Sequence, residues 1–386
     1  MEKIIIRSFL FSFTLIFILS KFVNIYAQEI TSDEMITSFL KLSPFQKGLC
    51  LNLNDEDGKT TIALAKGSSL TVQGISSDFE KAQKLRFIIS NTEVADRTSF
   101  VWKRTSHLPY LDDLINLVVA TNWEINDNKQ TSIAEIVRVL KPGGVAIIGS
   151  DTGTNLEGLV SEANKIYLSK AEKISRKGAW IKITKVQNPD FGEWSNLEGN
   201  AELNNVSPDK IFVAPYKEIR WCNGPIWATE TFQNAVYAGG RSYHHESIWV
   251  SPTFSQWYLI ARDANNGCEL WREKIDTKKG YVDKSFCADD KLVFCIEGAP
   301  NQLNELVARD GNSGKIYRKY PISLGASVTS LNDCLITGGT IIEKESGKIR
   351  WKKPAICQSA GANDTVFVYD GKNVEAVKLS DGKTIW

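Results

Sequence analysis

The sequence predicts an α/β module with a mostly parallel sheet, followed by an all-β module of repeated small sheets. Three observations predict this. Strand-like and helical segments alternate through residues 48–149, helical periodicity disappears beyond Pro189, and a Gly-x-x-x-Trp pattern recurs in the last third of the chain. At 386 residues the chain is too long for one ordinary core. We therefore expect one domain at residues 28–187 and a second at residues 188–386.

The first 27 residues have the pattern of a signal peptide. Lys3 and Arg7 give a positive start, residues 8–19 are apolar, and Ala27 stands where cleavage would occur. Lys21 interrupts the apolar run, which is shorter than the roughly 20 residues of a membrane-spanning helix. We expect an exported chain in the periplasm or cell envelope, without a stable membrane span once residues 1–27 are removed. An uncleaved anchor is the alternative.

The first module shows strands and helices in regular alternation. A short helix is expected through residues 35–40, ended by Pro44. Helical spacing predicts further helices at residues 59–66, 78–89 and 131–140, and apolar runs predict strands at residues 48–53, 70–75, 100–102, 114–120 and 145–149. The segment Lys141-Pro142-Gly143-Gly144 is expected to end the last helix before the sheet resumes. This alternation predicts a mostly parallel, helix-flanked sheet.

The second module is organised by a repeat. A glycine follows a short polar turn and a tryptophan stands four residues later, in the pairs Gly267 and Trp271, Gly347 and Trp351, and Gly382 and Trp386. A fourth copy, around Gly314, has Arg318 at the tryptophan position. The glycines recur every 33–47 residues, a spacing that suits one four-stranded propeller blade per copy. We expect an incomplete β-propeller, which is either a fragment or is completed by a partner.

Composition argues against several kinds of site. Lys plus Arg (46) balances Asp plus Glu (45), so no basic excess drives nucleic-acid binding and no nucleic-acid partner is expected. The seven cysteines include no Cys-x-x-Cys pair, and we expect no metal site. Cys287 and Cys295 flank a predicted hairpin turn. They are either partners in a disulfide or small buried strand residues.

Two histidine positions could carry chemistry. His244 and His245 are adjacent, and neighbouring side chains of an extended chain point to opposite sides, so one ion would not bind both. We expect them in a solvated loop between strands. His107 is either a base near a substrate or a histidine of a surface loop, and we favour the surface loop.

The first module resembles the class I S-adenosylmethionine (SAM)-dependent methyltransferases over roughly residues 45–185. The most specific stretches are residues 108–120 and residues 133–144, with Leu108-Pro109-Tyr110 at the start of the first and Lys141-Pro142-Gly143-Gly144 at the end of the second. In that family these segments lead into the fourth and fifth strands. The resemblance implies a Rossmann-like, methyltransferase-type sheet. Both stretches build the sheet, so they imply the fold more than the chemistry.

The resemblance also implies where SAM would bind. The family has a glycine-rich turn after its first strand and an acidic residue, which binds the ribose, at the end of its second. Here only Gly58 keeps a glycine position, Glu56 adds a side chain that we expect to crowd the cofactor, and Ser76 replaces the acid. If SAM binds, the implied contacts are Asn52, Asn54, Asp55, Glu56, Gly58 and Ser76. We expect a degenerate site, and no catalytic residue can be assigned.

The second module resembles pyrroloquinoline-quinone (PQQ)-type propeller repeats, in which the tryptophan docks between neighbouring blades. The whole chain resembles exported bacterial proteins that fuse a methyltransferase-like domain to such a propeller. No adjacent cysteine pair or calcium-binding set of the PQQ enzymes is present, so PQQ is not expected as a cofactor. We favour an exported binding or scaffold protein whose propeller holds an unknown ligand or protein partner. The alternatives are an active SAM-dependent methyltransferase and, with less support, a PQQ-dependent oxidoreductase.

Overall fold

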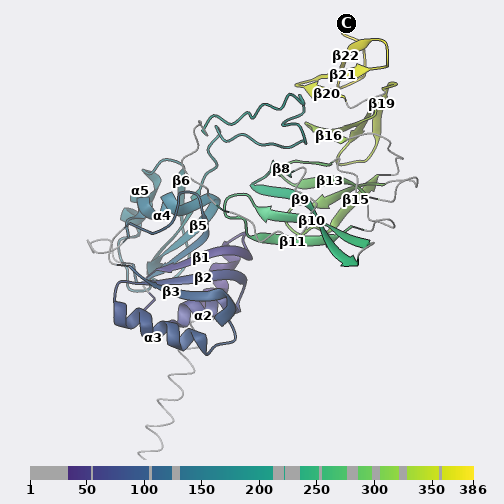
Figure 1. Ribbon diagram of the computed structural model, residues 1–386. Coiled ribbons are helices and arrows are strands. Elements are labelled where there is room, and N and C mark those ends of the chain that lie inside the picture. Colours follow the sequence, from purple (N-terminus) through teal and green to yellow (C-terminus); the bar gives the residue numbers. More distant parts are fainter. Residues whose placement is uncertain are drawn as a thin grey trace, which may run out of the picture. The chain divides into compact units, whose positions relative to one another are not determined.

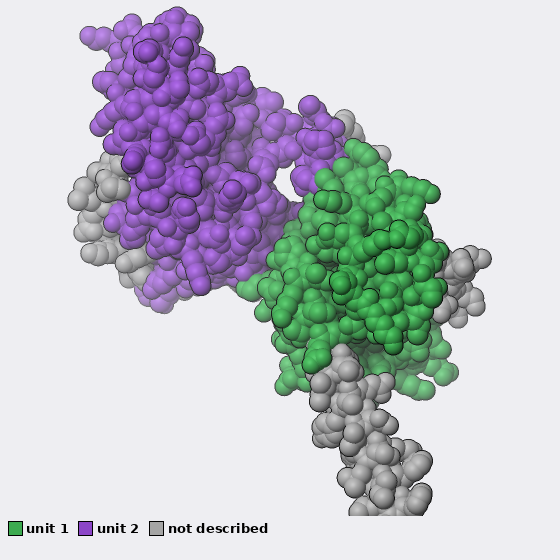
Figure 2. Space-filling view, turned by 180° about the vertical axis from the view of Figure 1, so that it is seen from behind, with its two compact units in different colours: residues 1–186 green, residues 187–386 purple. Residues whose placement is uncertain are grey.

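The computed structural model describes residues 34–53, 55–103, 107–123, 131–211, 221, 235–251, 254–275, 286–297, 305–320, 328–355 and 359–386. The expected signal peptide and Asn54 lie outside the described residues. The chain divides into two compact units, unit 1 (Met1–Val186) and unit 2 (Gln187–Trp386), which Figure 2 colours separately. In the described part of the chain, every helix is too short or too polar to span a bilayer.

Unit 1 is built on one seven-stranded sheet with the order β3-β2-β1-β4-β5-β7-β6 (Figure 1). The strands are β1 (Lys47–Leu53), β2 (Ser69–Ser76), β3 (Thr98–Trp102), β4 (Ile115–Thr121), β5 (Leu140–Ser150), β6 (Ser169–Lys173) and β7 (Ala179–Lys185). The first five are parallel, and β7 pairs antiparallel with both β5 and β6. Strand order reverses between β1 and β4, so the crevice beyond their carboxyl ends is the expected place for a ligand.

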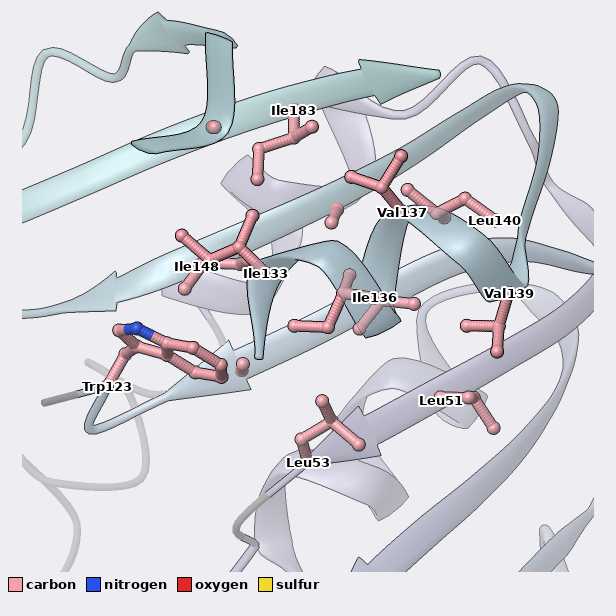
Figure 3. Packing of buried hydrophobic residues seen from close by; sticks show 14 of the residues in the cluster. Leu51, Leu53, Trp123, Ile133, Ile136, Val137, Val139, Leu140, Ile148 and Ile183 are labelled. Carbon is pink, nitrogen blue, oxygen red and sulfur yellow. The ribbon is translucent and has the colours of Figure 1, made fainter. Parts of the chain in front are cut away.

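Helices cover both faces of this sheet. They are a helix at residues 34–42, followed by α2 (Lys59–Lys66), α3 (Phe79–Ser90), α4 (Ile133–Val139) and α5 (Leu156–Asn164). One face packs against α4 and α5 in a cluster that includes Leu53, Ile136 and Ile148, part of which Figure 3 shows. The other face packs against α2 and the helix at 34–42 through residues such as Phe39 and Leu64. Unit 1 is therefore a three-layer α/β arrangement.

One predicted boundary in unit 1 is wrong. Lys141–Gly144 was expected to form the turn after the last helix, but β5 already begins at Leu140, which pairs with Ile115 of β4. The pairing register then shifts before Leu117, and Gly143 has φ 73. The two glycines therefore form an irregularity inside the strand, a conformation that glycine adopts without steric cost.

Unit 2 consists of consecutive antiparallel sheets, each with its strands in chain order. Three have four strands: β8 (Ala235–Ala238) to β11 (Glu269–Lys274), β12 (Phe286–Ala288) to β15 (Ile316–Tyr320), and β16 (Val328–Leu331) to β19 (Ile349–Lys352). The fourth has β20 (Ala360–Ala362), β21 (Thr365–Tyr369) and β22 (Val374–Lys378). The remaining strands are β9 (Arg241–Ser251), β10 (Phe254–Asp263), β13 (Leu292–Glu297), β14 (Glu305–Asp310), β17 (Cys334–Thr337) and β18 (Thr340–Glu343).

The first strands of successive sheets lie beside one another, β8 next to β12, β12 next to β16, and β16 next to β20. Apolar side chains from neighbouring sheets form shared clusters, one of which joins Val236 of β8 to Phe286 of β12. The described strands show this row of four sheets without a closed ring. The β8, β12, β16 and β20 strands are called the inner strands below.

The predicted hairpin between Cys287 and Cys295 is present, but the disulfide alternative is wrong. Cys287 pairs with Phe294, and Cys295 pairs with Phe286. This offset of one residue sends the two thiols to opposite faces of the sheet, because side chains alternate along a strand. Both thiols are free and fully buried, and burial raises the pKa of each.

Candidate functional site

The turn after β1 is closed by a carboxylate of the chain itself. Asp55 is 4% exposed, and its Oδ1 accepts a hydrogen bond from Gly58 N at 3.1 Å. Its Oδ2 accepts from Thr61 N at 2.9 Å and from Asn52 Nδ2 at 2.9 Å. Gly58 and Thr61 stand at the start of α2, where backbone N–H groups have no partner within the helix. Asp55 therefore uses amides that could otherwise face a ligand.

Asn52 extends this network under α2. Its side chain is fully buried, and Nδ2 also donates to Thr61 Oγ1 at 3.0 Å. Its Oδ1 has no hydrogen-bond partner among the described residues. Burial is the largest influence on Asp55 and raises the pKa of its carboxyl, although hydrogen bonds from Thr61 and Gly58 oppose the shift. Asn52 and Asp55 are thus interior residues of the fold.

Glu56 lies differently from what we expected. Its side chain is 78% exposed, and Oε2 lies 3.3 Å from Lys81 Nζ in the first turn of α3. The side chain does not fill the turn but joins the loop after β1 to the helix after β2. An exposed ion pair of this kind stabilises a protein by about 0–1 kcal/mol, so it can open at little cost.

Gly58 has a conformational role in the structure. Its φ is 80, in the left-handed region that glycine adopts readily. A Cβ at this position would lie 3.2 Å from Leu85 Cδ2 of α3 and 3.8 Å from Phe100 of β3. The glycine therefore allows the close approach of α3 and β3 to the turn.

Ser76 ends β2 with its side chain turned inward. It is 6% exposed, and its hydroxyl donates to Asp78 O and accepts from Asp78 N, both at 3.2 Å. Asp78 then caps α3, because its Oδ1 accepts from Lys81 N at 2.9 Å. Sequence reasoning missed this exposed carboxylate, although an aspartate just before a predicted helix is a recognisable N-cap.

An aromatic pair lies at the same end of the sheet. Trp102, the last residue of β3, meets Phe79 of α3 edge to face, with ring centroids 5.4 Å apart. Phe79 is 50% exposed. Lys103 follows, and its backbone N–H donates to Ser76 O. This pair was also missed, because nothing in the sequence shows that residues 79 and 102 lie together.

His107 lies in a surface loop that an ion network braces. Its side chain is 69% exposed, and Nδ1 lies 3.0 Å from Glu135 Oε1. Burial raises the pKa of Glu135, but hydrogen bonds from Arg138 and from Leu108 N–H outweigh it and hold that pKa below its usual value. Arg138 also donates to the Leu108 and Tyr110 carbonyls. This arrangement is that of a structural brace.

In unit 2, the repeat tryptophans lie against the glycine turns of the following sheet. Trp271 is 7% exposed, its Nε1 donates to Gly311 O at 2.8 Å, and a Cβ at Gly314 would lie 2.7 Å from its ring. Trp351 Nε1 donates to Leu379 O at 2.8 Å, and a Cβ at Gly382 would lie 2.9 Å from that ring. The same contact recurs between Trp221 and Gly267.

The repeat around Gly314 has Arg318 in place of tryptophan, and two side chains contact the next glycine turn there. Arg318 and Tyr320 both lie beside Gly347, at 3.4 and 3.5 Å from where its Cβ would be. Tyr320 is fully buried, and its hydroxyl donates to Lys344 O at 2.6 Å, while Tyr317 is 52% exposed. Trp386 is 66% exposed, with its ring centroid 6.3 Å from that of Phe367.

The expected solvated loop at His244 and His245 is wrong. Both lie within β9, paired with Ile260 and Leu259 of β10. Burial lowers the pKa of His244 to about 4 and that of His245 to about 3, so both are neutral at pH 7. His245 packs edge to face on Phe286, with centroids 4.8 Å apart. Sequence reasoning missed this because two polar imidazoles suggest solvent, whereas both lie inside a sheet, with His244 buried and His245 half-buried.

No family model matches the sequence, and no curated protein matches it. Part of the chain is similar to a solved protein from Methanococcus maripaludis, provisionally assigned as a SAM-dependent methyltransferase. The identity is 21% and the TM-score 0.36, over 40% of this chain and 85% of that one. A provisionally assigned sarcosine dimethylglycine methyltransferase from Galdieria sulphuraria is 18% identical, with a TM-score of 0.29, over 31% of this chain and 47% of that one.

A third similar structure is geranyl diphosphate C-methyltransferase from Streptomyces coelicolor A3(2), solved with Mg²⁺, geranyl diphosphate and S-adenosyl-L-homocysteine. It is 12% identical, with a TM-score of 0.30, over 32% of this chain and 46% of that one. The chain thus spans about half the length of the latter two proteins. In the order and direction of its own strands, unit 1 is a Rossmann-like mixed sheet with helices on both faces, and unit 2 adds antiparallel sheets.

Proposed function

We propose that this chain is an exported binding or scaffold protein. In this proposal unit 1 keeps a methyltransferase-type sheet as a structural module, and unit 2 is part of a PQQ-like propeller that binds a ligand or a protein partner. One observation carries the proposal for unit 1: Asp55 accepts hydrogen bonds from Gly58 N, Thr61 N and Asn52 Nδ2.

Asp55 and a bound cofactor would compete for the same backbone N–H groups at the start of α2. A cofactor bound over this turn would need backbone donors or open space at the start of α2. Asp55 takes two of those N–H groups and brings its own carboxyl into a buried position. A ligand carboxylate placed there would lack these donors. The start of α2 is therefore a poor anion site in this chain.

The repeated seams support the propeller part of the proposal. A ring from one sheet lies against a glycine turn of the next sheet at Gly314, Gly347 and Gly382, and the Trp221 ring lies against the turn at Gly267. The inner strands also follow one another side by side. Such seams let small sheets pack in series around a shared axis. Fold alone does not name the partner, which is argued separately below.

An active SAM-dependent methyltransferase is the second candidate, and a specific observation favours it. Asp78 places an exposed carboxylate two residues beyond the end of β2, close to where the family has its ribose-binding acid. The Glu56–Lys81 pair beside it is exposed and weak. In this alternative, SAM would displace that pair and bind between Asp78 and the Trp102 ring. A PQQ-dependent oxidoreductase gains no comparable support.

Calorimetric titration of the purified chain with SAM separates the two candidates. We expect no binding heat at millimolar SAM for the wild-type chain. A Glu56→Gly variant removes both the ion pair and the side chain over the turn, and we expect it to remain without binding because Asp55 still holds the amides. Saturable binding by the wild-type chain at micromolar SAM would establish the methyltransferase candidate instead.

A further inference from the structure

One short segment of unit 2 touches the inner strands of all four sheets. We call residues 193–201 the strap. The strap accepts one backbone N–H bond from each sheet. In the first two sheets, Tyr237 N of β8 donates to Trp194 O at 2.7 Å and Ala288 N of β12 donates to Ser195 O at 2.8 Å. In the last two, Ser330 N of β16 donates to Asn196 Oδ1 at 2.7 Å and Gly361 N of β20 donates to Ala201 O at 2.8 Å.

These four donors stand at the same place in each sheet. The innermost hairpins of three sheets end in the pairs Ala238 with Arg241, Leu331 with Cys334, and Ala362 with Thr365. In each case the donor is the residue just before that pair. Ala288 takes the same position, because the next residue, Asp289, donates to Leu292 O and closes its hairpin. Equivalent N–H groups of four sheets therefore converge on one segment.

Asn196 holds the strap to β16 through its side chain. Its side chain is fully buried, and while Oδ1 accepts from Ser330 N, Nδ2 donates to Ser330 O at 3.3 Å. The amide thus pairs with β16 as the peptide group of a neighbouring strand would. Asn196 also closes a tight turn, because it exchanges backbone bonds with Gly199.

Packing contacts accompany these bonds. Leu197 packs against the apolar cluster that joins the first two sheets, and Ala201 lies in the cluster of the last two. Glu193 Oε1 accepts from Gly239 N at 2.8 Å, so a side chain at the start of the strap is bonded as well. The strap therefore meets unit 2 with both backbone bonds and buried side chains.

We propose that the four inner strands form a groove for a peptide, and that the strap, which turns between Asn196 and Gly199, is its built-in occupant. Buried N–H groups must be paired, and the strap supplies three backbone acceptors and one side-chain acceptor at the required places. Addition of a peptide to strand edges is a known mode of recognition, in which main-chain bonds give affinity and side chains give specificity. This inference rests on the proposed binding role of unit 2 and not on the state of the turn in unit 1.

The covalent link of the strap to the groove sets how the groove behaves. A tethered segment competes at an effective concentration on the order of millimolar, so a peptide in solution is excluded while the strap is seated. Loosening the strap opens the groove. The peptide that fits best has the sequence of the strap, with an asparagine placed to pair with Ser330.

The first test uses the full chain and a fluorescent peptide with the sequence of residues 191–203. An Asn196→Ala chain loses both amide bonds to Ser330, and we expect it to bind the peptide at least tenfold more tightly than the wild-type chain does. The matched control is Asn204→Ala, since the Asn204 amide bonds to Glu202 and Val206, close to it along the chain. A peptide that carries alanine in place of Asn196 should not bind.

A second test keeps the strap sequence intact, in case Asn196→Ala prevents folding. Protease sites are inserted after Gln187 and between Asn204 and Asn205, all three of which are exposed. After both cuts the strap is held by noncovalent contacts alone, and we expect the labelled peptide to exchange with it and to coelute with the cleaved protein and not with the uncleaved protein. Equal binding to intact wild-type chain, or no binding to both the cleaved and the Asn196→Ala proteins, would overturn the proposal. SAM titration reports on unit 1 separately.

Discussion

The glycine turns of the two units are both filled by atoms of the chain itself, but by different kinds of side chain. In unit 1, Leu85 of α3 lies 3.2 Å from where a Cβ of Gly58 would be, and Asp55 of the same turn accepts the Gly58 N–H. In unit 2, the turn at Gly314 receives the ring of Trp271 from the preceding sheet. A glycine frees space near the backbone in both places, and atoms of the chain occupy what is freed. The comparison teaches that a glycine turn indicates a ligand site only when no residue of the protein fills it.

The largest expected effect is at the tryptophan seam. Trp271→Ala removes a buried indole and its bond to Gly311 O, so we expect the free energy of unfolding of unit 2 to fall by about 3–5 kcal/mol. Urea unfolding measures this, with peptide-level hydrogen exchange assigning the transition to unit 2. Trp386→Ala is the control, because that ring is 66% exposed, and it should change stability by less than about 0.5 kcal/mol. If the two substitutions lowered the free energy of unfolding equally, burial of the Trp271 ring would not be what stabilises the contact with the Gly314 turn.

The glycine side of the seam is next in size. Gly314 and Gly240 have almost the same φ, 72 and 71, but a Cβ at Gly314 would lie 2.7 Å from the Trp271 ring and one at Gly240 would meet nothing within 4 Å. Alanine at either position strains the backbone by about 1–2 kcal/mol. We expect Gly314→Ala to cost about 1–3 kcal/mol more than Gly240→Ala in urea unfolding. Similar losses of stability in the two variants would mean that Gly314 is needed only for its positive φ and not for the space beside the Trp271 ring.

A smaller effect is expected at the closed turn of unit 1. In Asp55→Asn, an amide NH2 in place of Oδ1 leaves Gly58 N without its acceptor, and one in place of Oδ2 leaves both Thr61 N and Asn52 Nδ2 without theirs. We therefore expect unit 1 to lose about 1–3 kcal/mol. Asp57→Asn is the control, because the Asp57 carboxylate is 57% exposed. A destabilisation no greater than that of the control would show that the carboxylate does not hold the turn.

Asp55 also gives a pH dependence of known sign. Its pKa is raised in the folded state, mainly by burial, so the folded chain holds this proton at pH values where the unfolded chain has lost it. The stability it contributes is complete below the unfolded pKa, near 3.9, and is lost as pH rises through the folded pKa. Asp55→Asn should remove this part of the pH dependence in urea titrations of unit 1. An unchanged profile would contradict the raised pKa.

The smallest effect is expected at the ion pair above the turn. Glu56→Gln removes the contact with Lys81 at a site where Glu56 is 78% exposed, so stability should change by less than about 0.5 kcal/mol at 0.15 M salt. Thermal unfolding measures this, with Lys66→Gln as a control that removes the similar exposed pair with Glu93. A loss above 1 kcal/mol would make the pair part of the closed turn.

Local patterns in the sequence were sufficient for much of unit 1. The helix predicted at residues 59–66 is α2, because its apolar residues recur at helical spacing and Gly58 and Gly67 bound it. The predicted strands of the parallel sheet are present as apolar runs. By contrast, the irregularity at Gly143 depends on the pairing of Leu140 in β5 with Ile115 in β4, which local patterns do not show.

Long-range contacts explain what the sequence could not predict at the candidate sites. The role of Asp55 depends on Asn52 and Thr61 lying together under α2, and the ring contact of His245 depends on Phe286 of the next sheet. The strap joins residues as far apart as Ala201 and Gly361. Composition and periodicity report on neighbours along the chain, so these contacts required the folded structure.

The most direct test of the central claim follows the amide signals of Gly58 and Thr61 by NMR while SAM is added. The account predicts that neither signal shifts at millimolar SAM, because Asp55 holds both N–H groups. A saturable shift of these two signals in the wild-type chain would show that the turn opens to a ligand and would contradict the account.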